Sequence, residues 1–123
     1  MHISSLSEIQ NPLKNSQGET IYELVGNAAR SGNATYHSLA VIVIPPGCSS
    51  EPHFHKVGEE TYYILSGIAR MQINEKEFTL STGQACLIQP YERHQITNSE
   101  DEDLQFIAIC APAWTAADSF PVS

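Results

Sequence analysis

The chain has 123 residues and a formal net charge of −8, from six basic and fourteen acidic residues. This length suits one domain that buries its own core, and the acidic balance excludes a surface that attracts nucleic acid or anionic membrane. We therefore expect a single domain over residues 1–123, with a core barrel at about 19–111, an N-terminal arm at 1–18 and a C-terminal tail at 112–123.

Short β-rich runs punctuated by glycine, proline or asparagine follow one another along the chain. Strands are predicted at residues 21–25, 39–44, 61–65, 68–73, 77–80, 85–88, 94–97 and 104–110. No window keeps a 3.6-residue period over a helix length, and the terminal segments are expected to form edge strands or arms. The pattern is typical of an all-β sandwich or barrel.

The apolar run 39–44 is closed by Pro45 and Pro46 and is too short to span a bilayer. The chain starts Met1-His2-Ile3-Ser4, without a cationic segment followed by an apolar one, so no secretory signal is indicated. We expect a cytoplasmic protein.

Three cysteines, Cys48, Cys86 and Cys110, are widely spaced and form no CxxC pair. This spacing excludes a disulfide framework and a zinc ribbon. Cys86 and Cys110 lie in apolar runs and are expected in the core, whereas Cys48 could line the mouth of a pocket.

Two histidines one residue apart, His53 and His55, begin the most informative cluster. On one strand they share a face about 6.6 Å apart, which lets both imidazoles reach one ion. Glu60 has the opposite parity, so a turn must intervene. Lys56-Val57-Gly58 supplies it, with Gly58 able to take positive φ, and the strand of Glu60 can then return beside the first.

His94 lies on a distant predicted strand, and a closed barrel is the simplest way to bring it opposite the first pair. Three imidazoles and one carboxylate can hold iron, manganese, nickel, zinc, cobalt or copper. The residues therefore predict one divalent transition metal per chain without selecting the element. His2 and His37 have no partner at a ligand spacing and are interpreted as ordinary histidines.

The spacing of these residues resembles the first motif of the cupin family. Gly47 is followed after five residues by His53, then after one by His55, after four by Glu60 and after six by Gly67. The distance to Gly67 favours Glu60 over its neighbour Glu59 as the ligand.

The second cupin motif resembles the segment from Gly83 through the run 85–88 to His94, eleven positions after the glycine, and on to Asn98. Fifteen residues, 68–82, separate the motifs. Where many cupins have a glycine in the turn before this histidine, the chain has Tyr91, which we expect near the cavity mouth. Asn98 is expected to hydrogen-bond backbone at a strand end.

The resemblance covers residues 45–98 and implies a small single-domain cupin: a double-stranded β-helix, or jelly-roll barrel, of two antiparallel sheets. It further implies a mononuclear metal inside the barrel and a chain that is often a homodimer. The ligands it implies are His53, His55, Glu60 and His94.

Four protein ligands on an ion that accepts six leave two positions for a small-molecule substrate. The first hypothesis is a metal-dependent dioxygenase-like enzyme that acts on a small oxygen-rich organic molecule. Glu60 is a candidate base, and Tyr62, which shares its face, is a candidate pocket residue. Arg70 and Gln72, which share a face of the next strand, are further pocket candidates, and a surface ion pair is an equal alternative for Arg70.

Three alternatives stay open. The chain could be an isomerase, lyase or decarboxylase type of cupin, a non-catalytic module that binds a small molecule, or a β-sandwich without metal. No nucleophile elbow, phosphate-binding loop or dinucleotide fingerprint competes with the metal site.

Overall fold

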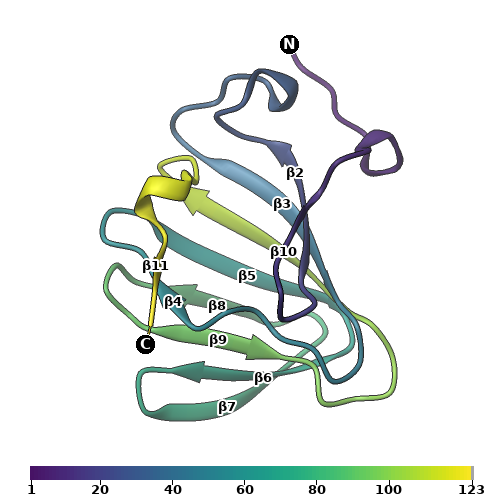
Figure 1. The fold of residues 1–123 in the computed structure, drawn as a ribbon, viewed down its shortest axis with the longest axis vertical. Helices are drawn as coiled ribbons and strands as arrows, with labels where there is room; N and C mark the ends of the chain where they lie inside the picture. Colours follow the sequence, from purple (N-terminus) through teal and green to yellow (C-terminus); the bar gives the residue numbers. More distant parts are fainter. Residues whose placement is uncertain (123) are drawn as a thin grey trace.

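The computed structural model describes residues 1–122, which form two antiparallel β-sheets that face each other (Figure 1). The all-β fold class predicted from the sequence is confirmed. The strands are β1 Leu13–Lys14, β2 Thr20–Val25, β3 Ser38–Ile44, β4 His53–Phe54, β5 Glu59–Ser66, β6 Ile68–Ile73, β7 Lys76–Ser81, β8 Ala85–Ile88, β9 His94–Thr97, β10 Leu104–Ala111 and β11 Phe120–Pro121. Three single 3₁₀ turns complete the elements: η1 Leu6–Glu8, η2 Ala29–Ser31 and η3 Ala116–Asp118.

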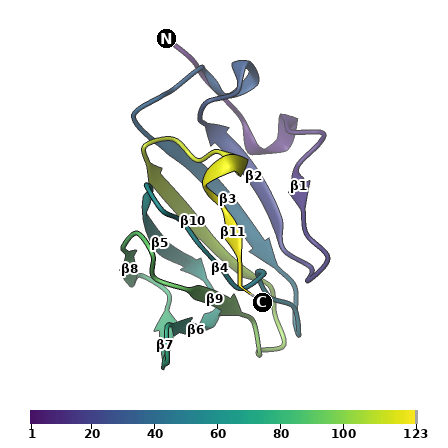
Figure 2. The same cartoon turned by 60° about the vertical axis from the view of Figure 1, so that its left-hand side comes forward.

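Strands that are distant in the sequence lie side by side in both sheets. The larger sheet has the order β1-β2-β3-β10-β5-β8, and the smaller has the order β11-β4-β9-β6-β7. The C-terminal segment runs back along the barrel so that β11 pairs with β4 (Figure 2). Within residues 1–122, no helix has the length and hydropathy that crossing a bilayer requires.

A glycine turn carries the chain from the larger sheet into the smaller one. Gly67 separates β5 from β6 and has a φ of 93°, in the left-handed region that glycine adopts at low cost. A Cβ at this position would also lie 3.1 Å from the carbonyl oxygen of Asp103. Gly67 is therefore required by both backbone conformation and space.

The turn between β4 and β5 also connects the two sheets. β4 pairs with β9 and β11, whereas β5 pairs with β10 and β8. The expectation that the strand of Glu60 returns beside the strand of His53 is therefore wrong. The two strands face each other across the barrel. The odd or even spacing of His55 and Glu60 therefore does not decide whether their side chains point toward each other.

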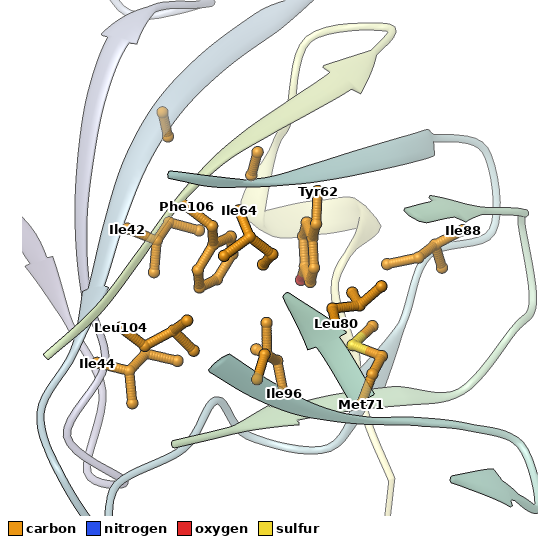
Figure 3. Close-up of a cluster of buried hydrophobic side chains, with 13 residues drawn as sticks. Ile42, Ile44, Tyr62, Ile64, Met71, Leu80, Ile88, Ile96, Leu104 and Phe106 are labelled. Carbon is orange, nitrogen blue, oxygen red and sulfur yellow. The ribbon is translucent and has the colours of Figure 1, made fainter. Parts of the chain in front are cut away.

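The core fills one end of the space between the sheets. Alternate residues of each strand point inward, as a period of two requires, and large side chains from both sheets converge there (Figure 3). Tyr62 and Phe106 pack with ring centroids 4.8 Å apart. The fully buried large residues of this cluster are Ile44, Tyr62, Ile64, Met71, Ile88, Ile96, Leu104 and Phe106.

Asn98 fixes the loop that follows β9. Its side chain is fully buried, and its Nδ2 donates hydrogen bonds to the carbonyl oxygens of Ile44 (2.8 Å) and Glu102 (2.7 Å). Its Oδ1 accepts from the backbone N–H of Glu100 at 3.0 Å. The expectation that this asparagine bonds backbone at a strand end is confirmed.

Candidate metal centre

The structure brings the four predicted ligand residues together inside the barrel. His53 on β4 and His94 at the start of β9 are cross-strand partners in the smaller sheet, and His55 follows β4 directly. Glu60 projects from β5 in the larger sheet. One donor atom from each residue lies within 4.8 Å of every other. The cluster therefore depends on both sheets.

Three of these donor atoms are buried and find no hydrogen-bond partner within residues 1–122. They are Nε2 of His55, Nε2 of His94 and Oε1 of Glu60. Both nitrogens lie 3.4 Å from the same carboxylate oxygen. Because a buried polar atom without a partner is costly, this arrangement fits an ion that all of them coordinate.

Backbone carbonyl groups fix which nitrogen of each imidazole carries the proton. The Nδ1 atoms of His53, His55 and His94 lie 2.7, 2.8 and 2.9 Å from the carbonyl oxygens of Glu51, Asp118 and Glu92, respectively. A carbonyl oxygen only accepts, so each neutral ring holds its proton on Nδ1. Each Nε2 lone pair then remains free for a metal.

The charges in the cluster favour an ionised Glu60. Burial raises the pKa of its carboxyl group, but His55 and His94 outweigh that effect and lower the pKa to about 2. Burial likewise opposes the charged form of His55, yet the adjacent Glu60 carboxylate leaves its pKa raised. For His53, burial and the nearby His94 lower the pKa to about 4. A carboxylate ligand and a neutral imidazole ligand are thus already favoured without an ion.

Asp118, at the end of η3, holds the turn between His55 and Glu60. Its carboxylate accepts hydrogen bonds from the backbone N–H groups of Lys56 (2.9 Å), Val57 (3.1 Å) and Gly58 (2.9 Å). Its backbone carbonyl is the group that orients His55. The sequence analysis missed this residue because it lies some sixty positions downstream, in a segment without a periodic pattern.

Gly58 plays a different role from the one expected. It is not among the glycines with positive φ in the described residues, so the turn does not require a left-handed conformation. A Cβ at this position would instead lie 2.9 Å from the Sγ of Cys110. The glycine is needed because the turn passes close to β10.

A cavity of about 330 Å³ adjoins the cluster. His53, His55 and Glu60 form part of its lining, and Tyr62, at 2% exposure, forms another part. Burial and the nearby Glu60 raise the pKa of Tyr62 well above its usual range, so its hydroxyl stays protonated. The other lining residues are Leu13, Glu19, Ile21, Glu23, Arg30, Ser38, Ala40, Ile42, Ala108, Cys110, Trp114 and Ala116.

Three of the predicted pocket residues lie elsewhere. Arg70 and Gln72 are exposed on the outer face of β6, and Arg70 pairs with Glu77 at 3.3 Å. Tyr91 has a φ of 70° and is 64% exposed, and its ring stacks on Phe54 with centroids 6.2 Å apart. The interpretation of these residues as cavity residues is therefore wrong. On β6, Arg70 and Gln72 alternate with apolar residues, and the apolar residues point into the barrel.

The cysteines divide differently from the expectation. Cys110 is buried and also lines the cavity, and Cys86 packs partly buried against the core. Cys48 packs against the core as well and does not line the cavity. Its expected place at a pocket mouth is therefore wrong.

Glu19 is a cavity residue that the sequence analysis missed. Its side chain is buried, lines the cavity, and accepts a hydrogen bond at 2.9 Å from Nδ2 of Asn15. Burial raises the pKa of Glu19 to about 7, and the charge of Glu60 adds to this effect. Glu19 lies directly before β2, outside every predicted strand, so the strand pattern gave no signal for it.

Comparison with known proteins gives a consistent family match. Residues 40–110 match the family model described as "Cupin domain". A segment of 71 residues, 58% of the chain and 59% of the relative, is 36% identical to the oxalate-binding protein of Thermotoga maritima. The chain covers less than two thirds of the length of each of the curated relatives that it matches first.

Solved structures resemble the whole fold. A predicted oxalate decarboxylase from Thermotoga maritima superposes with a TM-score of 0.75 and 28% identity, over 90% of this chain and 99% of that one. The oxalate decarboxylase of Bacillus subtilis, studied for its Mn(II) centres, superposes with a TM-score of 0.80 at 24% identity, over 95% of this chain and 31% of that one.

We predict that His53→Ala and His94→Ala each abolish metal retention while the fold is kept, because the hydrophobic core alone should stabilise a domain of this length. Elemental analysis of the purified protein, with circular dichroism, measures both properties. His37→Ala, which changes an exposed histidine outside the cluster, is the matched control and should keep the metal. Unfolding of both variants, or normal metal content in either, would contradict the prediction.

We predict that Asp118→Ala lowers metal affinity by roughly 10–100-fold, the usual effect of losing a group that orients a metal ligand. The turn between His55 and Glu60 loses three hydrogen bonds, whereas the four ligands remain. Competition with a coloured chelator measures the affinity. Asp101→Ala, in an exposed acidic turn, is the control, and equal affinities of the two variants would refute the role of Asp118.

Proposed function

The chain belongs to the cupin family, and on that premise we propose that it is a metal-dependent enzyme of the dioxygenase type that acts on a small, oxygen-rich organic molecule. His53, His55, Glu60 and His94 would hold one divalent transition metal. The observation that carries this proposal is that three of their donor atoms are buried without a hydrogen-bond partner in the described residues, beside a cavity of about 330 Å³. A cavity of this size lies at the lower end of the range for small-molecule sites.

The donor set supports a catalytic ion rather than a closed structural one. Three imidazoles and one carboxylate leave positions open on an ion that accepts six ligands. When bound, iron would supply dioxygen activation, whereas manganese, zinc or nickel would polarise a carbonyl group or acidify water. The protein's part is to keep His53 neutral and Glu60 ionised, as their surroundings already favour.

Proton transfer is better assigned to Glu19 than to Glu60. The Oε1 atom of Glu60 faces two imidazoles, and its pKa of about 2 makes it a weak base. Glu19 lines the same cavity with a pKa raised to about 7 by burial, which suits a group that both takes and gives a proton near neutral pH. Asn15 holds its carboxyl group in place.

A second candidate function is the binding or decarboxylation of a small carboxylate. The observation that favours it is the 36% identity to a protein named for oxalate binding, together with the fold match to a predicted oxalate decarboxylase. A carboxylate pair could chelate the same ion. This second function uses the same metal site and differs from the first only in the reaction at the metal.

The test offers the protein, loaded separately with Fe(II) and Mn(II), a panel of oxalate, 2-oxo acids and vicinal diols. We predict dioxygen uptake with the iron-loaded protein and at least one member of the panel, and its loss in His94→Ala but not in His37→Ala. An oxygen electrode and mass spectrometry of the products measure this. Carbon dioxide release without dioxygen uptake would favour the decarboxylase, and full recovery of bound ligand would favour a binding module.

We also propose that the chain forms a homodimer through the outer face of the larger sheet. Tyr63, Leu65, Leu87 and Ile109 are 42%, 39%, 52% and 40% exposed, and they project from three adjacent strands. A contiguous apolar patch on a sheet is typical of an interface between subunits. A second copy would cover the patch with the same surface.

We predict that Leu87→Asp converts a dimer into monomers because a charge within an apolar interface would be desolvated without a partner. Sedimentation equilibrium measures the mass. Thr79→Asp places the same charge on the outer face of the smaller sheet and should leave the dimer intact. A monomeric parent protein, or dissociation by Thr79→Asp alone, would refute the interface.

A further inference from the structure

The cavity is larger than a ligand made only of metal-binding oxygens would need. Its volume of about 330 Å³ corresponds to roughly ten water molecules. Oxalate, two carboxylates joined by one bond, fills only a part of this space. The remainder must accommodate either water or another portion of the ligand.

Small side chains hollow out the cavity along one row of the larger sheet. The register places Ala108 beside Tyr62 and Ala40 beside Ala108, and the next strand contributes Glu23. Ala108 and Ala40 point inward and are 7% and 8% exposed. At these two positions only a methyl group projects into the space between the two sheets. Space is therefore left on the inward face of β10 and β3.

The neighbouring row of the same sheet shows the contrast. Ile64, Phe106, Ile42 and Ile21 occupy successive strands, and all four carry large side chains. The first three fill the core between the sheets (Figure 3). The sheet thus has one filled row and one hollow row. On the other side of the hollow row, Cys110 lies beside Glu60 and Ser38 lies beside Cys110, and both also line the cavity.

The hollow row sets the length of the cavity. It extends from β5 across β10 and β3 to β2, which is three strand spacings or about 14 Å. Leu13 and Ile21 on one side, and Trp114 and Ala116 of the C-terminal segment on the other, contribute apolar lining. A slot of this length accommodates a ring beyond the oxygens that would reach the ion.

Arg30 belongs to the far lining and is exposed to solvent, whereas three other polar side chains of this lining are already engaged by the protein. Ser38 Oγ accepts a hydrogen bond from the backbone N–H of Trp114 at 3.0 Å, and Glu23 accepts one from Ser31 at 2.7 Å. Glu19 is bonded to Asn15. The surface beyond the donor cluster therefore favours an apolar group over a second carboxylate.

We infer that the ligand of this site is an aromatic or cyclic molecule that carries two adjacent chelating oxygens at one end, such as an aryl 2-oxo acid or an aromatic diol, and that Ala40 and Ala108 determine this specificity. The inference rests on the proposed metal site and names the class of molecule that it takes. Two oxygens would reach the ion, and the ring would lie over the two alanines against Ile21 and Trp114.

The closing experiment compares two probes on protein loaded with Zn(II). Oxalate represents the bare chelator, and 2-oxo-3-phenylpropanoate represents the chelator with a ring. Trp114 is the only tryptophan of the chain and lines the cavity, so its fluorescence reports a ring that enters, and calorimetry gives both affinities. We expect the ring-bearing probe to bind about ten-fold or more tightly than oxalate, because the ring buries apolar surface.

Ala40→Leu tests the hollow row without touching a metal ligand. It should weaken binding of the ring-bearing probe by about ten-fold or more, because the added side chain occupies the slot, and leave zinc content and oxalate affinity unchanged. Thr79→Leu, on the outer face of β7, adds a side chain outside both the cavity and the proposed dimer patch and should change neither. If Ala40→Leu does not fold, the comparison of the two probes on the parent protein still decides.

Oxalate binding as tight as or tighter than binding of the ring-bearing probe would overturn the inference and leave the proposed metal site standing. Equal loss of both probes in Ala40→Leu with zinc retained would also overturn it. Zinc-loaded protein that binds neither probe would overturn the proposed small-molecule function and this inference with it. Metal content, measured in every sample, separates these outcomes from failure of the metal site itself.

Discussion

Buried donor atoms that no protein group satisfies are the constraint on which the rest of this molecule depends. Nε2 of His55 and Nε2 of His94 each lie 3.4 Å from Oε1 of Glu60, and none of the three atoms has a hydrogen-bond partner within residues 1–122. Such an arrangement costs free energy unless an ion occupies its centre, and it persists because backbone carbonyls fix each imidazole from behind. The fold places these groups by facing two sheets against each other.

The same strands serve the site at one end and the core at the other. β5 contributes Glu60 and Tyr62 to the cavity and Ile64 to the core, and β3 contributes Ala40 to the cavity and Ile44 to the core. Large residues fill one end, where Asn98 ties the following loop to β3. Small residues leave the other end hollow. Core and cavity thus share the same strands, and Ala40, Ile42 and Tyr62 belong to both.

Much of this organisation could be predicted from the sequence. The eight long strands follow from alternating apolar runs between turn residues, whereas β1, β4 and β11 have two residues each and are too short to show a period. The four ligand residues share the spacing of a known motif. Which of the two sheets holds each ligand could not be predicted. A turn of three residues can connect two strands of a hairpin or two strands in different sheets equally well.

Residues whose roles depend on contacts distant in the sequence escaped prediction. Asp118 acts through backbone N–H groups some sixty positions away, which no local pattern reveals. Arg70 and Gln72 were correctly placed on one face of a strand, but the apolar Ala69 and Met71 take the inward face. Glu19 precedes both the predicted strand and β2, which begins at Thr20, so no strand pattern included it.

X-ray absorption at the manganese edge of the Mn(II)-loaded protein is the decisive measurement. It shows whether three imidazoles and one carboxylate hold the ion and leave positions open to the cavity. We expect a six-coordinate ion whose scattering fits three histidine ligands. Some of its remaining oxygen ligands should be replaced when a chelator is added. A closed four-coordinate shell, or a sulfur ligand supplied by the nearby Cys110, would contradict it.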